Sequence, residues 1–261
     1  MKLTRIPPTT RIAGPCSPLL YKGREDRPAI LLIHGFTGGP HDMHYLAQGI
    51  ADQGFTVSVP RLPGHGTNGD DFIQSSAKQW LRHSIDSYLD LRRTNETVLV
   101  GGLSMGGVLA LLLAAQFPVE GLMLFAPALV VSNPLIGLSK LIGSMIPRTR
   151  HVPRVDEEAE PELQEIQRQY GSFTWIRQGG ELYRLQRMCR KSLGHITADT
   201  MMVLSQQDIT VPLRSGEIIK RRINAKQLDY KIYTQSGHVI TNGIEKEKAL
   251  ADTLEWLSKR V

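Results

Sequence analysis

The sequence predicts an α/β fold with a mostly parallel central sheet and helices on both of its faces. Short apolar runs alternate with longer segments of helical periodicity, and the clearest of these runs are residues 29–33, 97–103 and 121–125. Near-continuous apolar runs are typical of strands that are buried on both faces of a parallel sheet. Helical segments between successive strands supply the crossover connections that parallel pairing requires.

The composition is that of a globular chain with a substantial core. The chain has 261 residues, of which 41% are hydrophobic, and this share is too high for a disordered protein. The length suits one large domain with an insertion, or two small domains. No run reaches the ~20 apolar residues that a membrane-spanning helix needs, so we expect no stable membrane insertion.

The N-terminus and the cysteines favour a cytoplasmic protein. Residues 1–8 carry charge, but no continuous apolar stretch follows them, so the sequence predicts no cleavable signal peptide. Cys16 and Cys189 lie far apart without metal-binding or redox spacing, and we expect both thiols to be reduced. The net charge is +6, but we interpret the basic cluster at residues 220–222 as a solvated helix face. We therefore expect no nucleic-acid partner.

The other elements of the expected core follow in chain order. Residues 1–28 are rich in Pro, Thr and Arg and form an N-terminal extension, with a strand signal at residues 19–21. Apolar runs next to turn residues predict three further strands at residues 55–59, 201–205 and 230–234. Apolar residues at helical spacing predict helices at residues 41–53, 75–93, 105–117 and 244–260.

The alternation of strands and helices is interrupted at residues 128–199. This stretch has no convincing buried strand, so we expect a helical insertion in a core domain of residues 29–127 and 200–261. Asn133 and Pro134 form a helix start, with Asn as the N-cap and Pro at the first helical position. The apolar residues among positions 135–146 share one helical arc, which either lines a groove or packs onto the core.

A serine lies at the turn between an expected strand and an expected helix. The turn reads Gly102-Leu103-Ser104-Met105-Gly106, which is the pattern G-x-S-x-G. Small flanking residues allow a sharp, strained turn, because a side chain at either flank would clash with the neighbouring strand or helix. The hydroxyl would then lie above a helix N-terminus, whose free amides favour developing negative charge. We interpret Ser104 as a nucleophile rather than as part of a tightly packed turn.

Two later residues follow strands in the order that a nucleophilic serine requires. A serine hydroxyl needs a base to accept its proton, and the base needs a partner that orients it. Asp208 follows the strand at residues 201–205, and His238 follows the strand at residues 230–234. Both are thus expected at the sheet edge where α/β proteins bind ligands. The alternatives are that Asp208 is a helix N-cap and that His238 is a loop histidine without a role.

Other residues of the same types fit these positions less well. Asp199 and His195 precede a strand, so they would lie at the opposite edge of the sheet, and His83 lies within an expected helix. Metal binding is also disfavoured. The remaining early histidines lack ligand spacing on one element with an acidic partner, and they are His34, His41, His44 and His65.

Two backbone amides are candidates for stabilising an oxyanion beside Ser104. One is the N–H of Met105, which directly follows the serine. The other is the N–H of Phe36, in the glycine-rich loop that follows residues 29–33. The alternative for this loop is a simple strand-to-helix connection, and it does not match a phosphate-binding loop.

Together these motifs resemble the α/β-hydrolase superfamily, and most closely its bacterial carboxylesterases and monoacylglycerol lipases. The matching segments are HGFTG at 34–38, PRLPGHG at 60–66, GLSMGG at 102–107, DITVP at 208–212 and SGHV at 236–239. The resemblance implies an α/β-hydrolase fold with a small helical cap, and ester hydrolysis through an acyl-enzyme without a cofactor. It implies that Ser104 is the nucleophile, His238 the base and then the acid, and Asp208 its orienting partner. Phe36 and Met105 would be the oxyanion donors.

The expected function is therefore a serine hydrolase that cleaves carboxylic esters with short to medium acyl chains, monoacylglycerols included. Its partner would be a small-molecule acyl ester, and the chain would act as a monomer or homodimer. Thioester, amide or C–C hydrolysis by the same serine is one alternative, and a non-catalytic binding protein is another. A further alternative, a protein that binds membrane surfaces, is supported by the net charge alone. Dehalogenase and epoxide hydrolase activities are disfavoured, because they need an Asp in place of Ser104.

Overall fold

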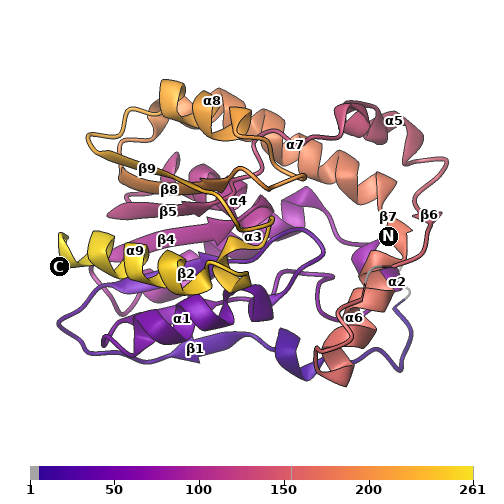
Figure 1. Ribbon diagram of the computed structural model, residues 1–261, viewed down its shortest axis with the longest axis horizontal. Coiled ribbons are helices and arrows are strands. Elements are labelled where there is room, and N and C mark those ends of the chain that lie inside the picture. The colour runs from indigo at the N-terminus through magenta and orange to yellow at the C-terminus, as the bar shows by residue number, and fades with distance from the viewer. Residues whose placement is uncertain (1–5, 154, 261) are drawn as a thin grey trace.

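The centre of the molecule is a seven-stranded sheet (Figure 1). The computed structural model describes residues 6–153 and 155–260. In spatial order the strands are β1 (Leu19–Tyr21), β3 (Thr56–Val59), β2 (Ala29–Ile33), β4 (Val98–Leu103), β5 (Gly121–Phe125), β8 (Asp199–Ser205) and β9 (Leu228–Tyr233). All neighbouring strands pair in parallel except β1, which is antiparallel to β3. The predicted α/β-hydrolase fold with a mostly parallel sheet is confirmed.

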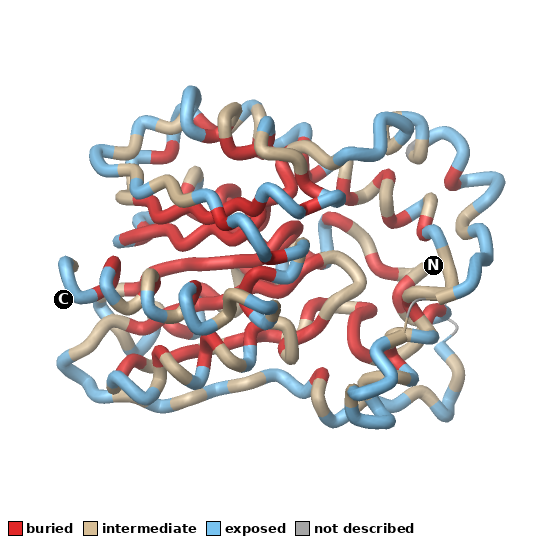
Figure 2. The backbone as a smooth tube through the Cα atoms, viewed as in Figure 1, coloured by how far each residue is buried: buried red, intermediate tan, exposed pale blue. Residues whose placement is uncertain are grey.

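Helices cover both faces of this sheet. On one face lie α1 (His44–Ala51) and α9 (Lys246–Ser258), which contact each other. On the other face lie α3 (Ala77–Arg92), α4 (Met105–Ala114), α7 (Ile176–Ser192) and α8 (Arg214–Arg222). Successive residues of β2 alternate between the two cores, since Leu31 packs in one cluster and Leu32 in the other. Figure 2 shows the strands as a buried layer with exposed residues around it.

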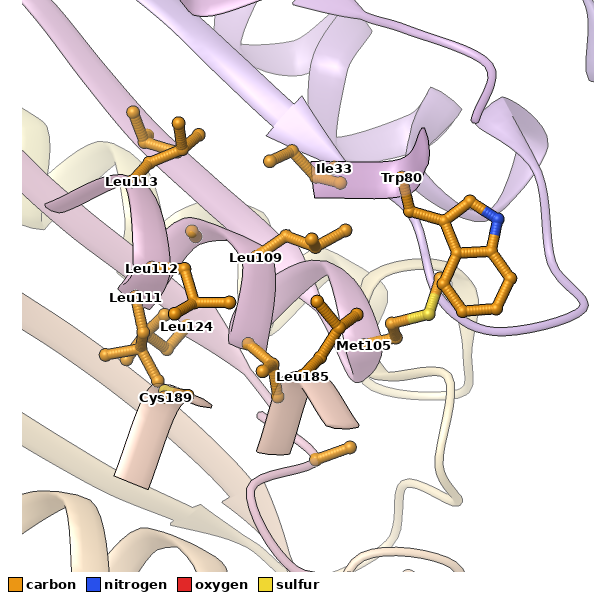
Figure 3. Close-up of a cluster of buried hydrophobic side chains, with 14 of the residues drawn as sticks. Ile33, Trp80, Met105, Leu109, Leu111, Leu112, Leu113, Leu124, Leu185 and Cys189 are labelled. Atoms are coloured by element: carbon orange, nitrogen blue, oxygen red, sulfur yellow. The ribbon is translucent and has the colours of Figure 1, made fainter. Parts of the chain in front are cut away.

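Helix α4 is the most deeply buried helix near the serine turn. Every one of its residues is buried, because it packs between the sheet and α7. Figure 3 shows Leu109, Leu111 and Leu112 of α4 in one buried cluster with Leu124 of β5 and Leu185 of α7, and the side chain of Met105 extending toward Trp80 of α3. The helix that follows Ser104 is therefore fixed on several sides, which leaves the turn little freedom to relax.

Several boundaries differ from those expected. The helix predicted at 41–53 is a 3₁₀ turn, η2 (Pro40–Met43), followed by α1. A short helix, α2 (Gly69–Phe72), was not predicted, although Asn68 caps it by accepting hydrogen bonds from two backbone amides. The strand expected at residues 19–21 is β1, which pairs with β3 and forms one edge strand of the sheet.

Residues 128–198, called the insertion below, connect β5 to β8, which are neighbours in the sheet. Asp199, which we expected within the insertion, is the first residue of β8. The elements of the insertion are η3 (Pro134–Leu138), α5 (Ser139–Ile142), β6 (Thr149–Arg150), α6 (Pro161–Gly171), β7 (Phe173–Thr174), α7 and η4 (Leu193–His195). Its two short strands pair only with each other.

The prediction of a single helix that starts at Asn133 and includes the apolar arc at 135–146 is wrong. Asn133 does cap a helical segment, because its side chain accepts from the N–H of Leu135, but the segment is the short η3 followed by the short α5. Gly137 and Gly143 lie within and directly after these turns, and glycine lowers helix propensity. The apolar arc is split as a result, and Met145 is 85% exposed. Helix α6 escaped prediction because its sequence is almost entirely polar.

Helix α7 holds the insertion to the core through polar side chains. Gln186 Nε2 donates to the backbone oxygen of Ala128 over 2.8 Å, and an Arg190 amino group donates to that of Leu129 over 2.7 Å. Gln178 Nε2 reaches the backbone oxygen of Ile73 over 2.6 Å. Within residues 6–153 and 155–260, no helix has both the length and the apolar character that crossing a membrane requires.

Candidate active site

Ser104 occupies a strained turn between β4 and α4. Its φ is 55° and its ψ is −114°, a conformation that residues other than glycine rarely adopt. Hydrogen bonds hold the turn on both sides. The N–H of Ser104 donates to the oxygen of Phe125 over 2.9 Å, and its own oxygen accepts from the N–H of Ala128 over 3.0 Å. The serine is 6% exposed and therefore almost fully buried.

The flanking glycines are required by close backbone contacts. A Cβ on Gly102 would lie 2.3 Å from the carbonyl carbon of Gly106, and a Cβ on Gly106 would lie 1.9 Å from the oxygen of Ile33. Both distances are far below a van der Waals contact, so no side chain fits at either position. The structure therefore explains why the pattern G-x-S-x-G is needed at this turn.

Asp208 and His238 are brought together on the loops that follow β8 and β9. His238 Nδ1 lies 2.7 Å from Asp208 Oδ2, and the side chain of Asp208 is only 1% exposed. The other carboxylate oxygen accepts from the amides of Thr210 and Val211 over 2.8 and 2.9 Å. Since Asp208 engages Nδ1, the Nε2 atom of His238 is the ring nitrogen left for proton transfer.

The carboxyl of Asp208 is held ionised by its partners. Burial opposes the charge, but the hydrogen bond and charge of His238, together with the amides of Val211 and Thr210, keep its pKa below the usual value. A buried carboxylate that faces an imidazole stabilises the imidazolium form. The pair can therefore store a proton on His238 during a reaction and release it afterwards. Among the described residues no hydrogen bond joins the Ser104 hydroxyl to His238, a bond that is often long before substrate binds.

The two expected oxyanion donors flank the serine turn. A Cβ on Gly35, directly before Phe36, would lie 3.4 Å from Ser104 Cβ, so this loop touches the serine. Within the described part of the chain, the backbone N–H groups of Phe36 and Met105 donate to no other group. The Phe36 ring is anchored edge-on against Phe72 at 5.2 Å between centroids. Two free amides thus lie beside a strained serine.

His34 supports this loop, a role that sequence reasoning missed. Its Nδ1 donates to the oxygen of Gly35 over 2.9 Å, and its Nε2 accepts from the N–H of Leu62 over 3.0 Å. Burial, reinforced by the nearby His65, holds the pKa of His34 well below its usual range, so the ring is neutral and in a single tautomer. The available signal was the pair His34-Gly35 directly after a buried strand.

A cavity of about 670 Å³ lies between the insertion and the loops that carry Phe36 and Asp208. Phe36 and Thr37 line it on one side, and Ile209 and Thr210 line it next to Asp208. The insertion contributes mainly apolar and aromatic side chains, which include Leu135, Ile136, Tyr170, Phe173, Trp175 and Leu182. The lining contains no Asp, Glu, Lys or Arg among the described residues. The cavity is therefore suited to an uncharged, largely apolar ligand.

The competing residues lie elsewhere. Asp199 is the first residue of β8, so it lies at the amino ends of the parallel strands, whereas Ser104 follows the carboxyl end of β4. Its carboxylate accepts from the N–H of Gln227 over 3.1 Å. His195 lies in η4 and His83 in α3. Cys16 Sγ lies 3.4 Å from His41 Nδ1, but the residue is fully buried and burial raises the pKa of the thiol to about 12, which disfavours the nucleophilic thiolate form.

Comparisons with known proteins identify the family. The sequence model of the serine aminopeptidase S33 family, Hydrolase_4, matches residues 24–245. A thermostable monoacylglycerol lipase from Bacillus sp. (strain H-257) is 30% identical over 88% of this chain and 90% of its own length. A carboxylesterase from Bacillus subtilis (strain 168) is 26% identical over 93% of this chain and 96% of its own length.

A solved structure gives the same result for the fold. The structure from the work on LipS and LipT, two metagenome-derived lipolytic enzymes, superposes with a TM-score of 0.85 at 26% identity. The match covers 95% of this chain and 100% of that chain. The chain therefore belongs to the Hydrolase_4 family and is an enzyme with the α/β-hydrolase fold.

Proposed function

We propose that this enzyme cleaves neutral carboxylic esters through an acyl-enzyme on Ser104. The observation that carries the proposal is the 2.7 Å contact between Asp208 and His238 on loops that converge at the edge bearing the serine turn. The relatives named as a monoacylglycerol lipase and a carboxylesterase support the reaction class. The substrates we propose are esters of short to medium acyl chains, including monoacylglycerols.

The proposed reaction has two halves. His238 Nε2 accepts the proton of the Ser104 hydroxyl while Oγ attacks the acyl carbon, and the oxyanion accepts hydrogen bonds from the amides of Phe36 and Met105. His238 then gives its proton to the leaving alkoxide oxygen, and the alcohol departs. Water repeats the sequence on the acyl-enzyme and releases the acid. Asp208 keeps the imidazole oriented and stabilises its charged form throughout.

The insertion is proposed to act as the cap that selects the ester. Its aromatic and aliphatic side chains form most of the lining of the cavity, so we assign the acyl chain to this space. The family name suggests peptides as an alternative class of substrate. An aminopeptidase site needs a carboxylate for the substrate ammonium group, whereas the described lining offers none. Esters are therefore favoured over N-terminal peptides.

Compartment and assembly are the remaining parts of the proposal. A cytoplasmic location fits the two free and buried thiols, Cys16 and Cys189. We propose that the chain acts as a monomer or homodimer, with no nucleic acid as partner.

An acyl-chain profile with one matched variant tests the substrate assignment. Gly179 of α7 lines the cavity, and a Cβ there would lie 3.6 Å from Ser139 Oγ, so a small addition fits whereas leucine fills the space. We expect Gly179→Leu to lower kcat/KM for a dodecanoyl ester about tenfold, with acetyl ester turnover within about twofold of wild type. Monoacylglycerols and a thioester complete the panel. Equal losses on both esters would contradict the acyl assignment, and negligible turnover of every ester would contradict the function.

A further inference from the structure

We propose that Glu245 is a positioning residue for His238, which it holds in register with Asp208 through the loop that precedes the histidine. This inference rests on the proposed function and adds a residue to its machinery. Glu245 lies seven positions after His238, directly before α9. Its Oε2 accepts from the N–H of Ser236 over 2.8 Å, from Ser236 Oγ over 2.9 Å and from the N–H of Gln235 over 3.1 Å.

The loop needs such an anchor because Gly237 and His238, unlike the buried Ser236, have little packing of their own. A Cβ on Gly237, the residue before His238, would meet nothing within 4 Å. His238 itself has a side chain that is 23% exposed, so packing alone does not fix its ring. Three donors on one carboxylate oxygen instead fix the backbone two residues before the histidine.

The same loop is tied to the strand that leads to Asp208. Ser205, the last residue of β8, donates its hydroxyl to the backbone oxygen of Ser236 and accepts from the N–H of Gln207 over 3.2 Å. Ser236 therefore bridges Glu245 on one side and the Asp208 loop on the other. A shift of Ser236 would change the distance between Asp208 and His238. The hydrogen bonds of Glu245 to Ser236 therefore affect the geometry that catalysis requires.

A further contact holds the residues after His238. Thr241 Oγ1 donates to the backbone oxygen of Asp42 over 2.6 Å, and Asp42 Oδ2 accepts from the N–H of Gly39 over 3.2 Å. Gly39 belongs to the loop that also carries Phe36. The histidine loop is thus fixed to the Asp208 loop at one end and to the oxyanion loop at the other.

The charge of Glu245 suits this role. Its side chain is 10% exposed, and Lys248 Nζ lies 3.4 Å from its second oxygen. Burial opposes ionisation, but the donors of Ser236 and Gln235 and the nearby Lys248 keep its pKa below the usual value. The carboxylate accepts strong charge-assisted bonds, whereas a glutamine amide oxygen accepts only weaker neutral ones.

The test compares Glu245→Ala, Glu245→Gln and Glu245→Asp in the full chain on p-nitrophenyl butyrate. We expect Glu245→Ala to lower kcat about tenfold or more with KM within about twofold, because ground-state binding in the cavity is untouched. Glu245→Asp should recover part of the kcat that Glu245→Ala loses. The kcat of Glu245→Gln should lie between those of the Ala and Asp variants. The matched control is Glu255→Ala, which changes an exposed glutamate within α9 that pairs with Lys259 over 2.7 Å and should leave kcat unchanged.

A second readout separates positioning from general destabilisation. The proton of His238 Nδ1 in its hydrogen bond to Asp208 should give a low-field NMR signal in the wild type. This signal should broaden or disappear in Glu245→Ala and persist in Glu255→Ala. Wild-type kcat in a folded Glu245→Ala variant would overturn the inference, as would a reduced kcat with an unchanged proton signal. If Glu245→Ala does not fold, the Gln and Asp variants decide by the same criteria. Retained hydrolysis in Ser104→Ala would instead overturn the proposed function.

Discussion

A methyl group on Gly106 would point at the backbone oxygen of Ile33, with only 1.9 Å between that oxygen and the position of the Cβ. The first turn of α4 is therefore in close backbone contact with the end of β2. This approach places the serine turn beside the loop that carries Phe36. The geometry of the site thus depends on a contact between two residues that have no side-chain chemistry of their own in the reaction.

Replacement of this glycine should be among the most damaging changes in the core. We expect Gly106→Ala to lower the free energy of unfolding by about 3 kcal/mol or more, because neither backbone can retreat without disrupting the sheet. The control is Gly194→Ala, where a Cβ meets nothing within 4 Å and the expected change is within about 0.5 kcal/mol. Urea unfolding measures both, and equal effects of the two substitutions would contradict the packing argument.

Two substitutions distinguish the role of Asp208 from that of Asp199, the other candidate carboxylate. Asp208→Asn removes the charge that faces His238 and should lower kcat by about 10²–10⁴-fold. Asp199→Asn changes a carboxylate at the opposite edge of the sheet, so kcat should stay within about twofold of wild type. Steady-state hydrolysis of p-nitrophenyl esters compares the two. The reverse ranking would move the acidic member of the site to Asp199.

Buried histidines predict a loss of stability in mild acid. Burial lowers the pKa of His65 to about 4, so the folded state keeps the ring neutral while the unfolded chain binds a proton below its usual pKa of ~6.5. Stability from this group is fully present above the unfolded pKa and declines as the pH falls toward the folded pKa. Between near pH 7 and about pH 5 the loss should be about 2 kcal/mol.

The variant His65→Gln isolates this contribution. Without the titrating ring, the difference in unfolding free energy between near pH 7 and about pH 5 should shrink by about 2 kcal/mol. His34, which is also buried and neutral, continues to contribute in the variant. Denaturant unfolding at the two pH values gives the comparison. A pH dependence identical in variant and wild type would show that His65 already titrates normally in the folded protein.

The core of the fold and the positions of the site residues could be predicted because their signals are local. The apolar runs that became β2, β4 and β5 identify buried strands directly. The turn at Ser104 requires glycines within two residues on either side, so its pattern is visible in five letters. Asp208 and His238 were predicted from their places after strands, and the structure brings their side chains into contact.

The contacts that fix the site could not be predicted in the same way. Glu245 reaches back nine positions to Ser236, and Thr241 reaches the backbone of Asp42 across 199 positions of the sequence. His34 binds the amide of Leu62, which follows the next strand. Such pairings depend on how loops meet after the sheet forms, and the hydrophobic periodicity of the sequence does not predict them. The insertion is hardest to predict, because its short turns and the polar helix α6 lack an apolar pattern.

Hydrolysis of a p-nitrophenyl ester by Ser104→Ala tests the central claim most directly. Removal of the hydroxyl removes the atom that forms the acyl-enzyme, so the account predicts a loss of kcat by about 10⁶-fold, to a rate near background. The variant should keep its unfolding temperature, because the Cβ and the strained backbone of the turn remain. Wild-type turnover by a folded Ser104→Ala variant would contradict the account, since the reaction would then proceed without the serine.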